Sequence, residues 1–420
     1  MRNSDSSIFR LASVGSYLDA LSSITDEMSL RERSNLIFLD KCLHQQWGLG
    51  QNVLLNWCPD GDGIALIVIP HYEVAAYSEQ RAARNGSNGS PTPSEAFFQA
   101  LLSGYRQLEP DRFDKVARLL NVEKTYLPLR ESVAEKPAQQ AIIEQMIKRY
   151  SINYVPSRAV ALFDIVGFSL LSPFEQMTQL NSLSYSLNSA QSKLMSKQIG
   201  IDFSRSSAGD GFYIWNRDLT LDANINLYHF MHLVLADNAI ARSKAEHNTV
   251  PELRACFHVG SSYEFHQAEG LNPTLYNYIV GDVTIELARM IEWAMPGQIL
   301  VGDFSAEMRT AKNGSGETVT VDSIDFVNRA TRSLEKLTGI VLSGDRVEVI
   351  KCYLTGSPMS NGEFSVRRIM ISDKHGIARN VYNAKANIYR HDAQPILLGI
   401  EDRAISADIV DSECIVRGQA

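Results

Sequence analysis

The chain has 420 residues, of which 45% are hydrophobic and 21% are charged, a composition typical of a globular protein with two or three domains. Its formal net charge is −8 and it contains no run of lysine or arginine, which argues against nucleic acid as a partner. The five cysteines are scattered, which argues against a zinc site or a disulfide framework. The longest apolar run, Ile64–Pro70, is too short to cross a bilayer, so we expect a cytoplasmic protein with no membrane partner.

The first 150 residues carry no recognisable chemistry and form an N-terminal region of unknown role. Residues 54–69 predict a pair of strands around the turn Pro59–Gly63. Asp60 and Asp62 in this turn resemble the start of a calcium loop, but further oxygen ligands at the required spacing are missing, so a hairpin turn is favoured. Residues 84–93 are polar and rich in glycine and serine, which predicts a surface loop.

A helix is predicted at residues 137–150, with proline in its first turn. The apolar run Ala159–Phe163 that follows predicts a buried strand. After that strand, Ser172-Pro173-Phe174-Glu175 fits a capping box and predicts the start of a long helix. A strand, a tight turn and a capped helix would together aim the turn's backbone amides at a phosphate.

The rest of the chain alternates between helical and strand patterns. Residues 227–240 and 283–295 predict helices, and residues 253–259 and 297–301 predict strands. Residues 155–305 therefore predict a sheet with helices on it. Residues 319–354 are rich in strand formers, and residues 356–362 predict a linker or turn before a final unit of about 60 residues.

Two aspartates stand at the ends of the predicted strands. Asp164 directly follows the apolar run 159–163, and Asp210 lies between two glycines just before the apolar residues 212–215. A buried carboxylate needs a partner, and a divalent metal ion suits two carboxylates at once. The pair therefore predicts a metal site that can hold a triphosphate.

Six short motifs occur in order along the chain: Phe163-Asp164-Ile165-x-Gly167-Phe168-Ser169, Gly209-Asp210-Gly211-Phe212, Arg254-x-x-Phe257-His258-x-Gly260, Gly281-Asp282, Ala288-Arg289 and Pro296-Gly297-Gln298-Ile299-Leu300-Val301. Together they resemble the catalytic domain of class III adenylyl and guanylyl cyclases over about 200 of the 420 residues. The resemblance implies an α+β fold with a ferredoxin-like βαββαβ core. It places the catalytic domain at residues 155–355, between the N-terminal region 1–150 and a small C-terminal domain at 356–420.

The resemblance also implies a mechanism. Two Mn²⁺ or Mg²⁺ ions would be held by Asp164, Asp210 and the backbone carbonyl of Ile165, and would activate the ribose 3′-hydroxyl for attack on the α-phosphate. Arg289 would stabilise the charge of the transition state, although a surface ion pair is its alternative role. Phe168 would contact the nucleoside triphosphate. In this family each site is shared by two subunits, so a homodimer is implied.

The chain departs from the family at the positions that select the base. These positions hold Ser206 and Tyr278, whereas adenylyl cyclases have lysine and aspartate and guanylyl cyclases have glutamate and cysteine. A tyrosine face and a short hydroxyl suit a smaller base, so a pyrimidine is expected. The neighbouring Arg205 should face away from Ser206.

Two further positions also depart from the family pattern. The transition-state asparagine of many members is replaced by Ile285, which cannot donate a hydrogen bond. No motif marks the lysine that binds the triphosphate: Lys336 and Arg346 both lie in the right region, and Lys336 is our candidate.

Residues 369–388 resemble a small sensor domain found behind bacterial cyclases. A cyclase with a pyrimidine pocket and such a sensor is similar to the cyclases of the bacterial anti-phage system Pycsar, whose cyclic UMP or cyclic CMP activates a separate effector. We expect UTP as the substrate, with CTP as the alternative. An adenylyl or guanylyl cyclase with an altered pocket and a catalytically silent nucleotide-binding regulator are the alternatives.

Overall fold

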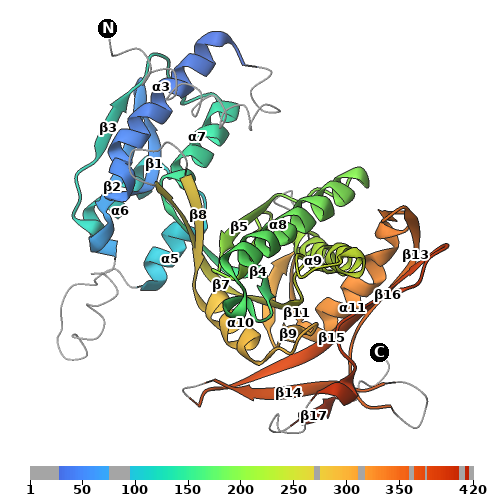
Figure 1. The fold of residues 1–420 in the computed structure, drawn as a ribbon. Coiled ribbons are helices and arrows are strands. Elements are labelled where there is room, and N and C mark those ends of the chain that lie inside the picture. The colour runs from blue at the N-terminus through green and yellow to red at the C-terminus, as the bar shows by residue number, and fades with distance from the viewer. Residues whose placement is uncertain are drawn as a thin grey trace. The chain divides into compact units, whose positions relative to one another are not determined.

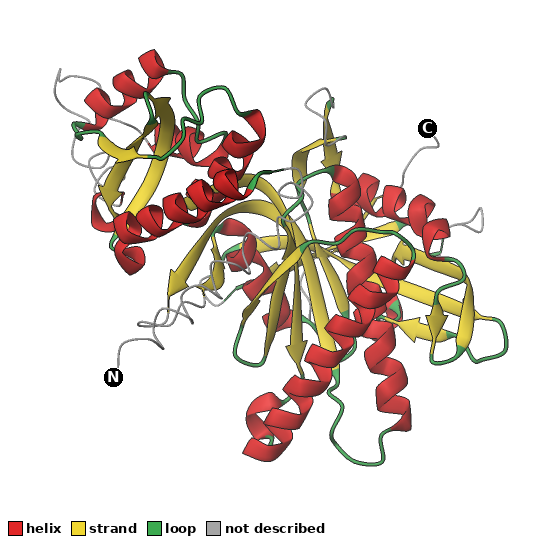
Figure 2. Ribbon diagram, turned by 90° about the horizontal axis from the view of Figure 1, so that it is seen from above, coloured by secondary structure: helices red, strands yellow, loops and turns green. Residues whose placement is uncertain are grey.

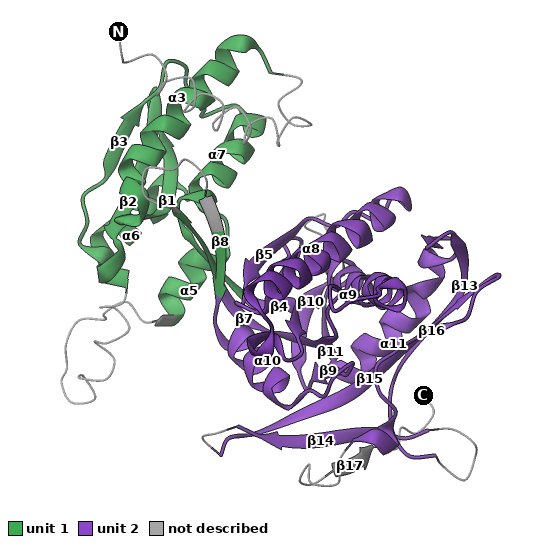
Figure 3. Cartoon of the chain, in the orientation of Figure 1, with its two compact units in different colours: residues 1–155, 263–279 green, residues 156–262, 280–420 purple. Residues whose placement is uncertain are grey.

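The structure is a computed structural model, and it describes residues 28–74, 95–268, 275–310, 317–358, 364–373, 376–405 and 412–415. The chain forms two compact units: unit 1 has residues 1–155 and 263–279, and unit 2 has residues 156–262 and 280–420 (Figure 3). The loop predicted at 84–93 lies outside the described residues. No described helix is long and apolar enough to cross a membrane.

Unit 1 is built on a small antiparallel sheet in the order β1-β2-β3. Asp60 at the end of β1 lies opposite Gly63 at the start of β2, which confirms the predicted hairpin. The elements of its N-terminal part are α3 (Leu30–Trp47), η1 (Gly48–Gly50), β1 (Asn52–Asp60), β2 (Gly63–Pro70), α5 (Glu95–Ser103), α6 (Pro110–Leu120), β3 (Thr125–Pro128) and α7 (Pro137–Arg149).

Both faces of the β1-β2 hairpin are buried, because apolar residues occupy both sets of alternating positions. Trp57 and Leu66 pack with residues of α3 and α7. Leu55 and Ile67 point to the opposite face and pack with residues of α5 and α6. Unit 1 is therefore a three-layer arrangement of helices, sheet and helices (Figure 1).

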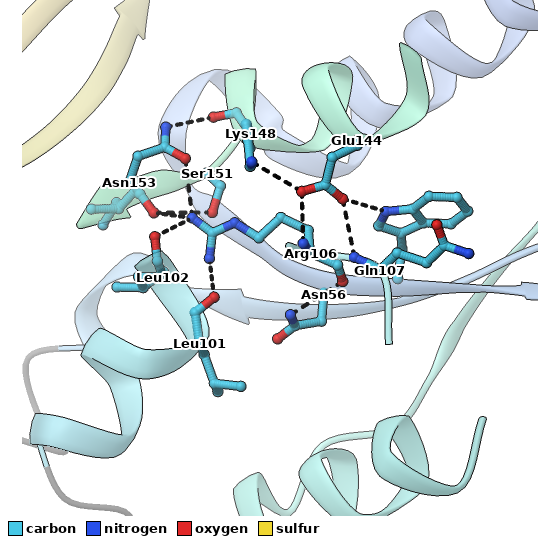
Figure 4. Close-up of polar contacts among 11 residues, drawn as sticks. Asn56, Leu101, Leu102, Arg106, Gln107, Glu144, Lys148, Ser151 and Asn153 are labelled. Atoms are coloured by element: carbon cyan, nitrogen blue, oxygen red, sulfur yellow. Dashed lines mark hydrogen bonds and ion pairs between the residues drawn. The ribbon is translucent and has the colours of Figure 1, made fainter. Parts of the chain in front are cut away.

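A polar network crosses the interior of unit 1 (Figure 4). The fully buried guanidinium of Arg106 donates to the carbonyls of Leu102 and Ile152, each at 2.8 Å. The buried carboxylate of Glu144 accepts from the backbone amide of Arg106 at 2.7 Å and from Trp57 Nε1 at 3.2 Å. These bonds satisfy groups that would otherwise be costly to bury, and they tie α5 and α7 to the sheet.

Unit 2 contains the predicted catalytic segment. Its elements are β4 (Ile152–Ile165), η2 (Phe168–Leu170), α8 (Pro173–Ser196), β5 (Phe203–Ser207), β6 (Gly211–Asn216), α9 (Leu221–Lys244), β7 (Leu253–Ala268), β8 (Leu275–Val280), α10 (Asp282–Trp293), β9 (Ile299–Gly302), β10 (Ser305–Arg309), β11 (Thr318–Asp322), α11 (Ser323–Ser333), η3 (Leu334–Leu337), β12 (Val341–Leu342), β13 (Asp345–Leu354), β14 (Val366–Ser372), β15 (Ala378–Arg390), β16 (Ile396–Leu398), η4 (Asp402–Ala404) and β17 (Ser412–Ile415). The start of β4, up to Val155, and the far end of the β7-β8 hairpin, residues 263–279, belong to unit 1.

The first part of unit 2 has the order β4-α8-β5-β6-α9-β7 along the chain, and its strands lie side by side in the order β7-β4-β6-β5. Strand β6 is antiparallel to both β4 and β5. This is the ferredoxin-like βαββαβ arrangement, so the predicted α+β fold and core are confirmed. Strands β9, β15 and β13 extend the same sheet beyond β7 (Figure 1). Figure 2 shows strands in yellow with helices in red packed against them.

Helices α8 and α9 cover one face of this sheet. Ala161 and Phe163 of β4 point to that face and join a core with Leu183 and Leu187 of α8 and with residues of α9. The predicted cap of α8 is confirmed, because the Ser172 hydroxyl accepts the Glu175 amide while the Glu175 carboxylate accepts the Ser172 amide. With α8 and α9 on this face, the opposite face of the sheet is left for other contacts.

The C-terminal residues take part in the same sheet. Strand β15 pairs with β9 on one side, where Val381 lies opposite Gly302, and with β13 on the other. Residues 356–420, expected to form a separate small domain, fall within unit 2 by their contacts. Their proposed sensor role remains a hypothesis about function.

Candidate active site

Asp164 stands at the end of β4 on the face of the sheet opposite α8 and α9. Because side chains alternate along a strand, Asp164 points away from the core that contains Phe163. Its side chain is only 8% exposed. Burial raises the pKa of Asp164 to about 6, the Arg254 guanidinium lowers it, and the neighbouring Asp210 carboxylate raises it further. The site thus holds the Asp164 carboxyl in surroundings that disfavour its ionised form.

Two glycines place Asp210 beside Asp164. Gly209 has a φ of +93°, a conformation that L-residues rarely adopt. A Cβ atom on Gly211 would lie 1.8 Å from the carbonyl oxygen of Phe163, so only glycine allows β6 to approach β4 this closely. The Ile165 amide then donates to the Asp210 carbonyl at 3.0 Å. The close strand contact therefore requires Gly211, and the backbone conformation before Asp210 favours glycine at 209.

Arg254 on β7 contacts Asp164 from the other side. Its Nε atom donates to Oδ2 of Asp164 at 2.6 Å, and its Nη1 atom donates to the carbonyl of Ala294 at 2.9 Å. The motifs predicted no role for Arg254, although the residue begins one of the six. Its charge beside the aspartates would also attract the phosphates of a nucleotide.

The donor set of this site suits a hard divalent cation. Two carboxylates and nearby backbone carbonyls offer only oxygen ligands, which Mg²⁺ and Mn²⁺ prefer. Within the described part of the chain there is no group of three or more His, Cys, Asp and Glu side chains that could enclose a metal ion. Asp164 and Asp210 alone would leave coordination positions open for phosphate oxygens and water.

The turn after Asp164 offers backbone donors. The amides of Ile165 and Val166 are already bonded to the carbonyls of Asp210 and Glu252, each at 3.0 Å. By contrast, the amides of residues 167–169 have no hydrogen-bond partner among the residues that the structure describes. Successive amides of this kind can bind an anion, and the phosphate contact expected at this turn stays a prediction.

Ser206 lies on the same face of the sheet as Asp164. In the strand register Asp164 is opposite Gly211, Leu162 is opposite Tyr213, and Tyr213 is opposite Ser206. Directly paired residues in a sheet share a face, so Ser206, Tyr213 and Asp164 project to the same side. The structure thus brings one base-position residue to the side of the sheet that carries the aspartates.

Tyr278 and Arg205 have other surroundings. Tyr278 is exposed and its ring stacks on Phe265 with centroids 5.7 Å apart, in the part of the β7-β8 hairpin that belongs to unit 1. Arg205 donates to Ser184 of α8 at 3.0 Å and lies over the Phe212 ring. Arg205 therefore points away from Ser206, as expected, and faces α8.

Helix α10 packs over the aspartate face at both of its ends. The Tyr213 hydroxyl lies 3.5 Å from the carbonyl of Thr284 near the start of the helix, and Arg254 reaches the carbonyl of Ala294 at its end. Arg289 lies on this helix, where it contacts Glu292 at 3.1 Å and Asp373 at 3.8 Å. Ile285, at the position of the missing asparagine, is exposed on the same helix.

The remaining predicted residues lie away from the aspartate face. Lys336 is exposed on η3, beside α11. Burial is the main cause of the lowered pKa of His229 on α9, and the charge of Lys336 lowers it further. Phe168 on η2 is half-buried against the core under α8. Within one chain the structure brings together Asp164, Ile165, Asp210 and Arg254, and it places Ser206 on the same face of the sheet. The roles of four other residues remain predictions: Phe168, Tyr278, Arg289 and Lys336.

No protein-family model and no curated protein sequence matches the chain. Solved structures resemble it at low identity. A guanylate cyclase domain from Catenaria anguillulae in complex with GTP is 11% identical, covers 57% of this chain and 100% of that chain, and has a TM-score of 0.32. An adenylyl cyclase from P. aeruginosa is 12% identical over 58% of this chain and 97% of that chain, with a TM-score of 0.30.

A bacterial light-regulated adenylyl cyclase is 11% identical over 40% of this chain and 90% of that chain, with a TM-score of 0.25. Because all of these TM-scores are low, we base no functional argument on the likeness.

Proposed function

We propose that the chain is a metal-dependent nucleotidyl cyclase, which converts a nucleoside triphosphate to a 3′,5′-cyclic nucleotide and pyrophosphate. The observation that supports this most directly is the pair Asp164 and Asp210, held together by the Ile165 amide and faced by Arg254. Oxygen ligands on one side and a guanidinium on the other suit a metal-bound triphosphate.

In the proposed reaction the ribose 3′-oxygen forms a bond to the α-phosphorus while the bond from that phosphorus to the β-phosphate oxygen breaks. The 3′-hydroxyl proton leaves to solvent and pyrophosphate departs. When bound, Mg²⁺ or Mn²⁺ supplies the Lewis acidity that lowers the pKa of the hydroxyl and neutralises phosphate charge. Asp164, Asp210 and the Ile165 carbonyl orient the reactants, and the free amides of the turn bind a phosphate.

Arg289 is proposed to meet the charge that develops on the α-phosphate. In the proposed homodimer, one subunit contributes the aspartates and its partner contributes Arg289, Ser206 and Tyr278. Lys336 is proposed to bind the triphosphate. The homodimer itself rests on the sequence resemblance.

A pyrimidine is proposed as the base. Ser206 replaces the charged residue of the purine cyclases and lies opposite Tyr213, so this position offers hydroxyl groups and no charge. One hydroxyl can pair with a single carbonyl or amino group of uracil or cytosine, whereas a purine edge presents more groups to satisfy. UTP is proposed ahead of CTP. The proposed biological role, a second messenger that activates a separate effector in anti-phage defence, rests on the sequence resemblance.

The test is a comparison of the four nucleoside triphosphates. Purified full-length protein is incubated with Mn²⁺ and each triphosphate, and the products are identified by mass spectrometry. Cyclic UMP, or cyclic CMP, as the main product is expected. Cyclic AMP or cyclic GMP as the main product would instead identify a purine cyclase with an altered pocket. The absence of any cyclic product, together with measurable triphosphate binding, would identify a silent nucleotide-binding regulator.

A further inference from the structure

The turn between β14 and β15 is closed by Asp373. Its Oδ1 atom accepts a hydrogen bond from the Ile377 amide at 3.0 Å, and its own amide donates to the Ile377 carbonyl at 3.1 Å. The Gly376 amide donates to the Asp373 carbonyl at 2.9 Å. These bonds occupy one carboxylate oxygen in the turn and leave Oδ2 pointing to other partners.

The second oxygen of Asp373 faces two arginines from different elements. Oδ2 accepts from Nη1 of Arg379 on β15 at 2.8 Å and lies 3.8 Å from Nε of Arg289 on α10. Only 2% of the Asp373 side chain is exposed. A buried carboxylate is costly unless cations compensate it, so this contact constrains both guanidiniums.

Arg379 ties the same turn to α10 at a second point. Its Nε atom donates to Oε2 of Glu286 on α10 at 2.7 Å, and only 11% of its side chain is exposed. Arg289 itself donates through Nη1 to Glu292 at 3.1 Å. Its Nη2 atom has no partner in the part of the chain that the structure describes, so one edge of the guanidinium is left for another acceptor.

We propose that Asp373 is a positioning residue for Arg289, so that the β14-β15 turn belongs to the catalytic machinery. This inference rests on the proposed cyclase function. The Asp373 carboxylate holds Nε of Arg289, Glu292 holds Nη1, and the remaining edge is presented to the phosphate. A C-terminal segment whose motif predicted only a sensing role therefore contacts the residue proposed to stabilise the transition state.

The test uses the full-length protein with Asp373→Asn, because asparagine keeps the Oδ1 acceptor of the turn and replaces the charged Oδ2 acceptor by an amide donor, which cannot hold either guanidinium. With the triphosphate that the wild type uses best, kcat is expected to fall by about 10- to 100-fold with KM little changed, as for a misplaced group that acts in the transition state. Asp373→Glu should recover part of the loss. In an Arg289→Ala background, Asp373→Asn should have no further effect.

Asp345→Asn is the matched control. Asp345 also pairs with an arginine of β15, Arg390, at 3.3 Å, but it contacts neither Arg289 nor Arg379 in the described structure. Its kcat should stay within about twofold of the wild type, the change expected of an ion pair that is partly exposed. An equal loss in Asp345→Asn would show that any broken ion pair of this sheet reduces turnover, and would overturn the proposal.

A second measurement does not depend on activity. The rate at which phenylglyoxal modifies Arg289 is followed by mass spectrometry of the proteolytic peptides, and should rise several-fold in Asp373→Asn but not in Asp345→Asn. An unchanged rate, an unchanged kcat, or a kcat that rises in Asp373→Asn would overturn the proposal. If the wild-type protein formed no cyclic product, the proposed function would be wrong. The modification rates would still show whether Asp373 holds Arg289.

Discussion

The Nε atom of Arg254 donates a hydrogen bond of 2.6 Å to Oδ2 of Asp164, yet this cation does not fully compensate the buried carboxylate. Burial and the nearby Asp210 outweigh it and leave the pKa of Asp164 at about 6, above its ordinary value of 3.8. The contribution of this group to stability is therefore fully present below pH 3.8 and is lost as the pH rises through 6. At neutral pH the metal-free fold bears the cost of a charge that a cation would offset.

Replacing Asp164 by asparagine should consequently stabilise the metal-free protein. At pH 8 we expect Asp164→Asn to raise the melting temperature by about 2–4 °C. For a unit of the size of unit 2 this corresponds to roughly 1 kcal/mol of unfolding free energy. Addition of Mn²⁺ should raise the melting temperature of the wild type but not that of the variant. Scanning calorimetry with and without Mn²⁺ measures both effects.

Asp202→Asn is the control for this substitution. Asp202 is exposed and pairs with Arg217 at 3.2 Å on the surface of unit 2. Its melting temperature should follow that of the wild type in both conditions. If Asp164→Asn melted lower than the wild type without metal, the buried charge would be stabilising the fold and the account of this carboxylate would be wrong.

Three buried histidines predict instability in acid. Burial lowers the pKa of His229, His232 and His258 to about 4 each, from an ordinary value of 6.5. Because the unfolded chain binds these protons first, the stability from the neutral imidazoles is present above pH 6.5 and is lost as the pH falls through 4. Urea unfolding between pH 7.5 and pH 4.5 should show a fall of up to about 1.4 kcal/mol per pH unit for each histidine.

Single substitutions separate these histidines from other acid effects. His229→Gln can keep the hydrogen bond to the Ala330 carbonyl, which His229 Nε2 makes at 3.0 Å, and should reduce the pH slope. His391→Gln should not reduce it, because His391 is exposed beside Glu348, which raises its pKa. A slope that stays the same in His229→Gln would contradict the assignment.

The two glycines beside Asp210 should differ in their tolerance of alanine. Gly211→Ala places a Cβ atom on the Phe163 carbonyl and should force β6 away from β4, with loss of cation binding and of much of the stability of unit 2. A Cβ atom at position 209 would lie in open space, so Gly209→Ala is unfavourable only because of the backbone φ of +93°. We expect it to lower the unfolding free energy by about 1–2 kcal/mol. Chemical denaturation of both variants checks the order. Equal losses would contradict the close strand contact.

The interior network of unit 1 predicts a large effect at Arg106. Burial lowers the pKa of Arg106 to about 10, but its side chain is held by carbonyls of three residues and by Asn153. Arg106→Met should destabilise the protein by about 3 kcal/mol or more, because those acceptors are then left buried without a donor. Arg118→Met, at an exposed arginine of α6, should change the unfolding free energy by less than about 0.5 kcal/mol.

The local part of the site could be predicted from the sequence. The apolar run before Asp164, the Gly-Asp-Gly turn and the capping box at Ser172 are short-range patterns, and each is found where it was predicted. The contact of Arg254 with Asp164 joins residues that are far apart in the chain, so no local pattern indicated it. Its place at the start of a conspicuous motif was the one available signal.

Pairing between strands that are distant in the sequence explains the features of the fold and site that the sequence patterns did not predict. The predicted strand at 253–259 is the first half of a longer strand, β7, and the hairpin that it begins carries Tyr278 into unit 1. Strand β15 pairs with β9 and β13, and the turn before it meets α10 through Asp373. Pairings between strands that are distant in sequence depend on the whole sheet and leave no periodic signal in either strand.

The central claim is that Asp164 and Asp210 form one metal-dependent catalytic site, and turnover of Asp210→Asn against Asp202→Asn tests it most directly. Both substitutions remove one negative charge from unit 2 near β5 and β6. With saturating Mn²⁺ and the best substrate, the kcat of Asp210→Asn should fall by more than about 100-fold, the most that removal of a group hydrogen-bonded to a metal ligand typically costs. The kcat of Asp202→Asn should stay near that of the wild type. A near-normal rate in a folded Asp210→Asn protein would contradict the account.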